Sequence, residues 1–357
     1  MSADAGGIAT TRTFAGVAIG RWRSGFIAGP AYDALFFIFA PLLGLGLAVL
    51  VSTSAGPGAQ GEFVDPAVAW FIGVWTYAHL CAVAFRSHLD QAVFVRHRVR
   101  FVAVPLLLYV VFAFSTPIRA LGFVVAIFWD VYHTSAQNFG FCRIYDAKLG
   151  NPPAQGRTLD LWLNHFIYIG PILGGINLIP HLNNLNSLAP LGIHPVHFIA
   201  TVVRYHTLIT QIVIVAAIDY VVFYLYRYWQ LRRQGYSVSP QKICLLASTA
   251  IASLVAWGTL PTLEAFFVAN FFHGLQYFAI VWWSENGNIR RVFGLERPAF
   301  PPQLAGLAYL AIVAAMGIGY RYASLASSAL LISFPLVISL MHFWYDGFVW
   351  SVRRREV

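Results

Sequence analysis

Long apolar segments follow one another along almost the whole chain, and they constrain its fold more than any other feature. Of its 357 residues, 59% are hydrophobic and 10% are charged, whereas a soluble globular domain carries roughly 25% charged residues. A helix of about 20 apolar residues crosses a bilayer core about 30 Å thick. We therefore expect an all-α, polytopic integral membrane bundle of ten transmembrane helices, at 31–53, 65–85, 100–116, 119–140, 159–179, 196–229, 242–259, 262–284, 302–319 and 327–350.

The placement of the basic residues predicts how this bundle is oriented. Among 23 Lys and Arg residues, only Arg119 and Arg321 fall in the loops of one side, and Arg204 lies within a predicted span. All the others lie in the two tails or in loops on the side of the tails. Basic residues accumulate on the cytoplasmic side of membrane proteins. The pattern predicts cytoplasmic termini in a bacterial inner membrane, and it assigns the net charge of +9 to topology rather than to a nucleic-acid partner.

The segments form one predicted domain with two short tails. Residues 1–28 are expected to be a flexible cytoplasmic tail, 29–352 the transmembrane helical domain, and 353–357 a basic tail. No internal repeat or linker divides the chain. The three cysteines lack the paired spacing of a zinc motif or of a disulfide framework.

Histidines recur inside the apolar segments, and the predicted topology brings several of them to one level near the cytoplasmic face. Ionisable or metal-binding groups at membrane depth cost several kcal/mol and usually mark a functional interior. We therefore expect one metal site in the inner half of the bundle. Its candidate ligands are His79, His88, His133, His165, His273, His342 and Asp346.

The spacing of neighbouring polar residues supports this metal site. Asp130, His133 and Gln137 lie three or four residues apart, as do His342 and Asp346, so each set shares one helix face. Imidazole with carboxylate suits iron, zinc, copper or manganese. We expect one or two iron ions, with another transition metal as the alternative, and we expect Asp130 and Gln137 to orient ligands or bound oxygen. Separate hydrogen bonds between helices are the structural alternative.

Three segments carry a resemblance to a known family. These are Asp130–Gly140, His273-Gly-Leu-Gln276-Tyr and His342-Phe-Trp-Tyr-Asp346-Gly. They resemble the motif-bearing helices of the Brp/Blh-type carotene-cleaving oxygenases, which are polytopic bacterial membrane proteins. The resemblance implies non-haem iron with imidazole ligands at His133, His273 and His342. Membrane fatty-acid desaturases and hydroxylases are similar in logic, but their HxxxH and HxxHH boxes are absent from this sequence.

The sequence predicts a membrane-embedded non-haem iron oxygenase, hydroxylase or desaturase that acts on a lipid or isoprenoid. Such an enzyme also needs an electron donor, which the sequence does not identify. Two other functions stay open. Intramembrane Asp and His residues form proton relays in transporters, and Pro171, Pro261 and Pro335 supply possible helix breaks. A b-type haem protein with His133 and His273 as axial ligands is the third possibility.

Overall fold

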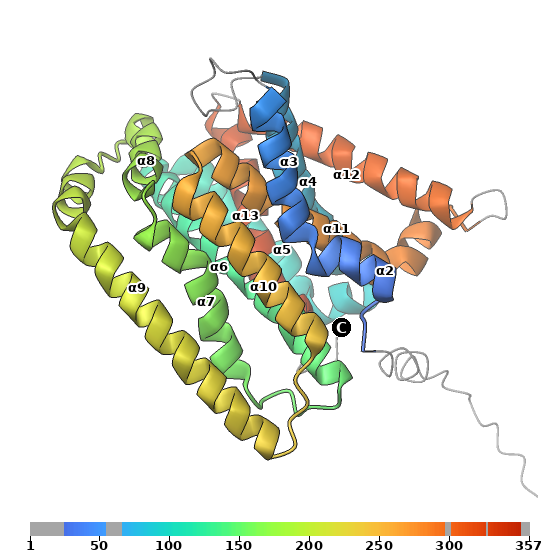
Figure 1. Cartoon of the computed structure of the whole chain (residues 1–357). Helices are drawn as coiled ribbons and strands as arrows, with labels where there is room; N and C mark the ends of the chain where they lie inside the picture. Colours follow the sequence, from blue (N-terminus) through green and yellow to red (C-terminus); the bar gives the residue numbers. More distant parts are fainter. Residues whose placement is uncertain (1–24, 55–65, 297–300, 326–327, 351–357) are drawn as a thin grey trace, which may run out of the picture.

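The computed structural model describes residues 25–54, 66–296, 301–325 and 328–350, and this part of the chain is helical without any strand (Figure 1). Each predicted segment corresponds to a helix. The long helices are α3 (Ala40–Ser54), α4 (Pro66–Ser87), α5 (Gln91–Phe114), α6 (Thr116–Lys148), α7 (Arg157–Gly174), α9 (Val196–Arg233), α10 (Pro240–Thr259), α11 (Thr262–Val292), α12 (Pro302–Ser324) and α13 (Ala329–Val349). A short helix, α8 (Leu178–Asn183), and a 3-10 helix, η2 (Asn184–Leu191), connect α7 to α9.

The helices fit a membrane protein, although fewer of them have the composition of a span than the sequence predicts. In the described residues, seven helices are long and apolar enough to cross a bilayer, or up to eight with the bent helix before α3. The predicted span 119–140 lies in α6 and most of 159–179 lies in α7, and neither helix is among them. Both helices carry charged residues that are buried against each other, such as Arg143 and Asp160. The all-α fold is confirmed, while the cytoplasmic location of the termini stays a prediction and most of both tails lies outside the described residues.

The first helical segment is sharply bent before α3. It comprises α2 (Pro30–Asp33) and a π-helix, η1 (Ala34–Ile38), and its axis is bent by 56° against that of α3. The Phe37 carbonyl accepts a 2.9 Å hydrogen bond from the Gln276 amide of α11. The carbonyl of the next residue accepts one from the Ser248 hydroxyl of α10. Side chains of neighbouring helices therefore satisfy backbone groups at the bend and hold it in place.

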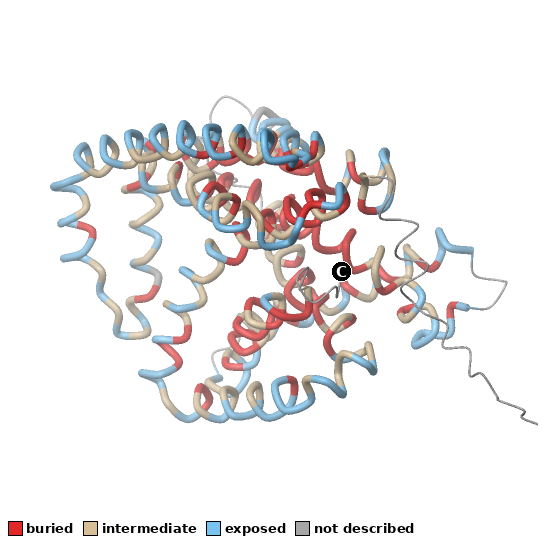
Figure 2. The backbone as a smooth tube through the Cα atoms, turned by 90° about the horizontal axis from the view of Figure 1, so that it is seen from below, coloured by how far each residue is buried: buried red, intermediate tan, exposed pale blue. Residues whose placement is uncertain are grey.

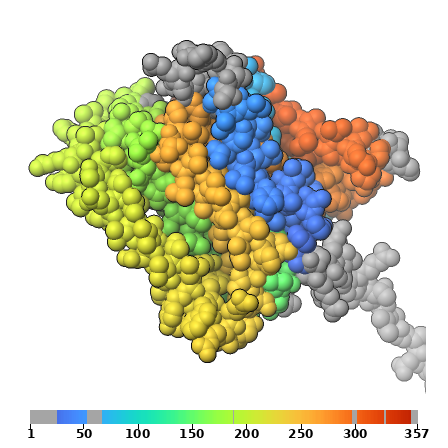
Figure 3. Space-filling view, viewed as in Figure 1, coloured from blue at the N-terminus to red at the C-terminus, as the bar shows by residue number. Residues whose placement is uncertain are grey.

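Helix α11 forms the centre of the bundle and α9 forms its edge. Within the most apolar window of each helix, 78% of residues are buried in α11 but only 6% in α9. Figure 2 shows the buried residues gathered in the middle of the bundle, with exposed positions along the outer helices. In Figure 3, α9 runs along the flank of the molecule beside α7 and α10. The outward face of α9 is apolar, as expected for a helix in contact with lipid.

The close contact between α4 and α12 depends on Gly317. A Cβ atom at this position would lie 2.5 Å from the Val74 carbonyl oxygen and 2.8 Å from the Ala78 Cβ, which is closer than atoms can pack. We expect Gly317→Ala to push the two helices apart and to destabilise the protein by about 1–3 kcal/mol. Thermal unfolding of the detergent-purified protein measures this effect.

Gly319 provides the matched control for this prediction. It is exposed on the same helix, and a Cβ there meets no atom within 4 Å. Alanine favours helix more than glycine does, so Gly319→Ala is expected to keep or slightly raise the unfolding temperature. Equal unfolding temperatures for the two variants would show that the contact at Gly317 does not limit stability.

Candidate metal centre

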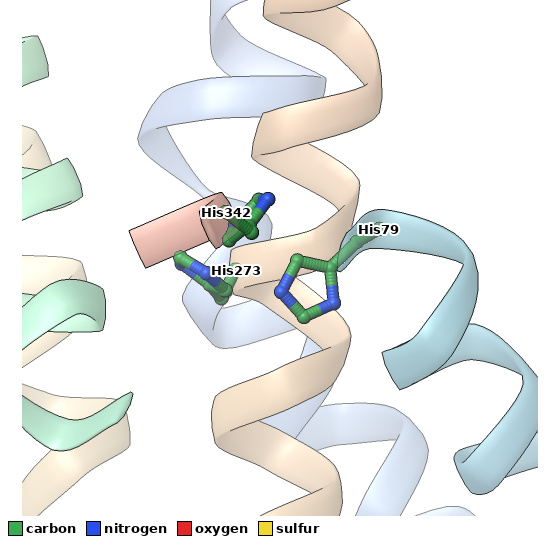
Figure 4. Close-up of side chains that lie close together, drawn as sticks. All are labelled: His79, His273 and His342. Atoms are coloured by element: carbon green, nitrogen blue, oxygen red, sulfur yellow. The ribbon is translucent and has the colours of Figure 1, made fainter. Parts of the chain in front are cut away.

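Four helices each bring one buried histidine to the centre of the bundle. His79 lies on α4, His133 on α6, His273 on α11 and His342 on α13, and none is more than 4% exposed. The ring centroid of His342 lies 5.1 Å from that of His79 and 4.8 Å from that of His133. The His273 centroid lies 4.9 Å from that of His79 and 5.1 Å from that of His133. Figure 4 shows three of these rings meeting between α4, α11 and α13.

The ring nitrogens are close enough to share a metal ion. The Nε2 atoms of His133 and His342 are 3.1 Å apart, and one nitrogen from each of His79, His273 and His342 lies within 4.8 Å of the others. Two nitrogens bound to the same ion at about 2.1 Å lie about 3.0–3.4 Å apart when they occupy adjacent positions. The Oδ2 atom of Asp346 is 3.7 Å from Nε2 of both His133 and His342. The cluster therefore offers imidazole and carboxylate donors around one point.

Within the described part of the chain, several of these ring nitrogens have no hydrogen-bond partner of normal geometry. Among the described residues, neither ring nitrogen of His79 or of His273 makes a hydrogen bond of normal geometry, and neither does Nδ1 of His342. A buried polar group without a partner costs about 1–3 kcal/mol, so nearly all such groups in native proteins are satisfied. A metal ion would accept these lone pairs without requiring a hydrogen-bond donor. The donor set therefore fits a transition-metal ion.

Two aromatic side chains hold the carboxylate of Asp346. Its Oδ1 atom accepts hydrogen bonds from the Tyr277 hydroxyl (2.9 Å) and from the Trp350 indole (3.1 Å). These bonds leave Oδ2 as the oxygen nearest to the two histidine nitrogens. The sequence reasoning assigned no polar role to either aromatic residue. Their spacing was the available signal, because Tyr277 follows His273 by four residues and Trp350 follows Asp346 by four.

Gln137 and Asp130, which we expected to orient ligands, both lie on α6 together with His133. The Gln137 amide donates to the His273 carbonyl and to Oε1 of Gln276, both at 3.1 Å. It therefore fixes α6 against α11 beside a candidate ligand. Its own Oε1 is buried and has no partner among the described residues. Asp130 lies one turn before His133 on the same helix, and its orienting role stays a prediction.

The structure does not bring His88 and His165 into this cluster. The His88 ring bonds through Nδ1 with the Ser87 hydroxyl (2.7 Å) and through Nε2 with the Phe101 carbonyl (3.3 Å). Partial removal from water lowers the pKa of His88, which favours the neutral ring that accepts one bond and donates the other. The half-buried His165 on α7 bonds with the Ser135 hydroxyl at 2.9 Å. Both rings thus have partners elsewhere.

A buried ion network lies elsewhere in the bundle, and the sequence analysis did not anticipate it. Lys242 on α10 contacts Asp146 (2.7 Å) and Asp160 (2.6 Å), and Arg143 on α6 contacts both carboxylates as well. Each of these side chains is at most 5% exposed. Hydroxyls of the tyrosines at 224, 228 and 236 donate to the same carboxylates. The network contains two positive and two negative charges and joins α6, α7, α9 and α10.

A cavity of about 300 Å³ reaches the histidine cluster. Its wall includes His133, Gln137 and Asp346, together with apolar side chains such as Phe343 and Ile280. This volume is at the lower end of the range for small-molecule sites, and such sites combine an apolar wall with a few polar groups. A small apolar molecule, or part of a longer one, has room beside the candidate metal ligands.

Comparison with known proteins adds no assignment to these residues. No protein-family model, curated protein or solved structure matches the chain. The candidate site therefore rests on the geometry of its own residues.

Proposed function

We propose that this protein is a membrane-embedded non-haem iron oxidoreductase, an oxygenase, hydroxylase or desaturase, that acts on a lipid or isoprenoid. The observation that supports this most is the convergence of four buried imidazoles from four helices, two of which also lie beside the Asp346 carboxylate. Imidazole and carboxylate ligands with open positions are typical of non-haem iron in oxygenases. The resemblance of three segments to Brp/Blh-type oxygenases favours the same metal over zinc, copper or manganese.

A single iron ion fits the residues better than two ions do. His342 belongs to both groups of potential ligands, the one with His79 and His273 and the one with His133 and Asp346. A neutral imidazole has one lone pair for a metal, so His342 completes only one of the two groups. We propose that one iron binds where the two groups meet, with His342 as the ligand common to both and His133 as its nearest neighbour, and that Asp346 lies beside the iron as a ligand or as the acceptor for a bound molecule.

The residues around the site have separate roles in this proposal. Bound iron supplies the activation of dioxygen that an attack on an unactivated C–H or C=C bond requires. Tyr277 and Trp350 fix the Asp346 carboxylate. The apolar wall of the cavity, with Phe343, excludes water from reactive species. The Gln137 side chain, in the same wall, fixes α6 against α11 through its amide.

The packing of the rings argues against the haem alternative. A haem with two axial histidines needs one ring on each face of the macrocycle. The rings of His133 and His273 are instead in direct contact, with centroids 5.1 Å apart and planes at 88°. No slot for a porphyrin separates them.

Metal analysis together with an absorption spectrum of the detergent-purified protein tests the proposal. We expect about one iron per chain and no Soret band. Absence of stoichiometric metal from protein prepared without chelators would reject it, and a Soret band would favour haem. Proton or solute flux in liposomes that is insensitive to chelators would favour a transporter.

A further inference from the structure

The cavity beside the histidine cluster is elongated along α6. This helix lines it from Trp129 to Ile144, and 15 residues of α-helix span about 22 Å. Most side chains on this face are apolar. The few polar ones lie at two levels along the axis of α6. His133 and Gln137 belong to the level of the histidine cluster, whereas Arg143 and Arg157 lie further toward the loop between α6 and α7.

The two arginines in the cavity wall differ in their charge balance. Arg143 is neutralised, because Asp146 and Asp160 both pair with it. Its other terminal nitrogen donates to two backbone carbonyls. Arg157, in contrast, is exposed and has no acidic partner within the described ranges; its guanidinium lies over the Phe139 ring at 5.2 Å. The cavity therefore has one uncompensated positive charge, at the start of α7.

We propose that the cavity binds an amphiphile with an oxyanion head that pairs with Arg157 and an apolar chain that reaches His133. Arginine binds carboxylate or phosphate oxygens through paired hydrogen bonds. Phe139 follows His133 by six residues, or about 9 Å along the helix axis. A head at the Arg157 guanidinium, which stacks on Phe139, leaves room for several carbon atoms before the chain meets the histidine cluster. The reacting bond of the substrate is then remote from its head.

That the cavity holds the substrate rests on the proposed function. The test of this inference, however, measures binding and not turnover. The full-length protein in zwitterionic nanodiscs is titrated with palmitic acid or hexadecanol, each brominated on the chain, and quenching of tryptophan fluorescence is recorded. The acid is expected to bind about tenfold more tightly than the alcohol, since a charge-assisted hydrogen bond is lost in the alcohol. Arg157→Gln is expected to remove this preference, and Arg157→Lys to keep part of it.

The matched control is Arg233→Gln, because Arg233 also stacks on an aromatic ring, that of Trp229 on α9 at 4.9 Å, but lies away from the cavity. It should keep the preference for the acid. Trp129→Phe should reduce quenching and Trp229→Phe should not, since Trp129 lines the cavity and Trp229 does not. Equal binding of acid and alcohol, or an unchanged preference in Arg157→Gln, would overturn the inference. Quenching that depends on Trp229 instead of Trp129 would also overturn it, as it would indicate partition at the lipid-facing surface.

Iron content measured on the same samples separates this inference from the proposed function. Protein without metal that still prefers the acid through Arg157 would refute the iron enzyme and keep the amphiphile site. Protein with iron but without that preference would keep the metal centre and refute the amphiphile site. A further titration with hexadecyl phosphate distinguishes a carboxylate head from a phosphate head. The tighter binder of palmitic acid and hexadecyl phosphate defines the class of substrate.

Discussion

Replacing His342 by alanine is expected to abolish stoichiometric iron in the purified protein. His342 belongs to both groups of potential ligands, and its Nε2 lies 3.1 Å from that of His133. Loss of a residue that only supports a ligand already weakens metal binding about 10–100-fold, so loss of a ligand itself is expected to weaken it by more than about 100-fold. Metal per chain after size-exclusion chromatography is the measurement, and His133→Ala should give the same result.

The two histidines outside the cluster provide matched controls for this prediction. His88→Ala and His165→Ala should keep wild-type iron, because both rings have partners elsewhere. Elution volume and helical circular dichroism establish that each variant is folded, and His342→Gln serves as a second substitution with a smaller change in volume. A folded His342 variant with full iron would refute the ligand set. Loss of iron only in the His88 or His165 variant would place the metal elsewhere.

Lys242→Met is expected to be among the most destabilising substitutions in the chain. It would leave Asp146 and Asp160 buried, with Arg143 still paired with both carboxylates. Removing one partner of a buried ion pair costs about 3–5 kcal/mol, because the remaining charge is uncompensated. We expect the unfolding temperature of the detergent-purified protein to fall by at least about 6 °C.

A second substitution tests whether charge balance is the cause. In the double variant Lys242→Met with Asp146→Asn, one negative charge is removed together with the positive one, so part of the lost stability should return. Arg233→Gln, on the exposed end of α9, should leave the unfolding temperature within experimental error. If the double variant is as unstable as Lys242→Met or less stable, packing and hydrogen bonds rather than net charge determine the contribution of the lysine.

Hydropathy located the helices well, and the errors have physical causes. Helix α4 spans Pro66–Ser87 where 65–85 was expected. Helix α5 begins at Gln91, nine residues before the predicted span, because Asp90 caps it by accepting a hydrogen bond from the Val93 amide. Its first turns are basic, so an apolar window misses them. The end of α6 was placed too early for a similar reason, since its last turns carry the charges of the buried network.

Sequence spacing gave the level of the candidate ligands in the bundle but not which helices are neighbours. The pair His342 and Asp346 was visible as one helix face. His88 was included for its level alone, although it follows His79 by nine residues, which turns an α-helix by about 900° and so places the two on opposite sides. His165 was at the expected level too, but its ring on α7 bonds with Ser135 of α6 and does not join the four histidines. The arrangement of the helices in space separates His88 and His165 from the residues of the cluster.

The π-helical turn before α3 makes the first span more tolerant of changes in side chains than of changes in length. Its Phe39 amide bonds with the Ala34 carbonyl, five residues back. The Phe37 carbonyl accepts from Gln276, which in turn accepts from Gln137 beside His273. An apolar exchange at an exposed position leaves this chain of bonds intact. Losing or gaining one residue would rotate every later position of the span by about 100°, and these hydrogen bonds would transmit the change of register to the middle of the molecule.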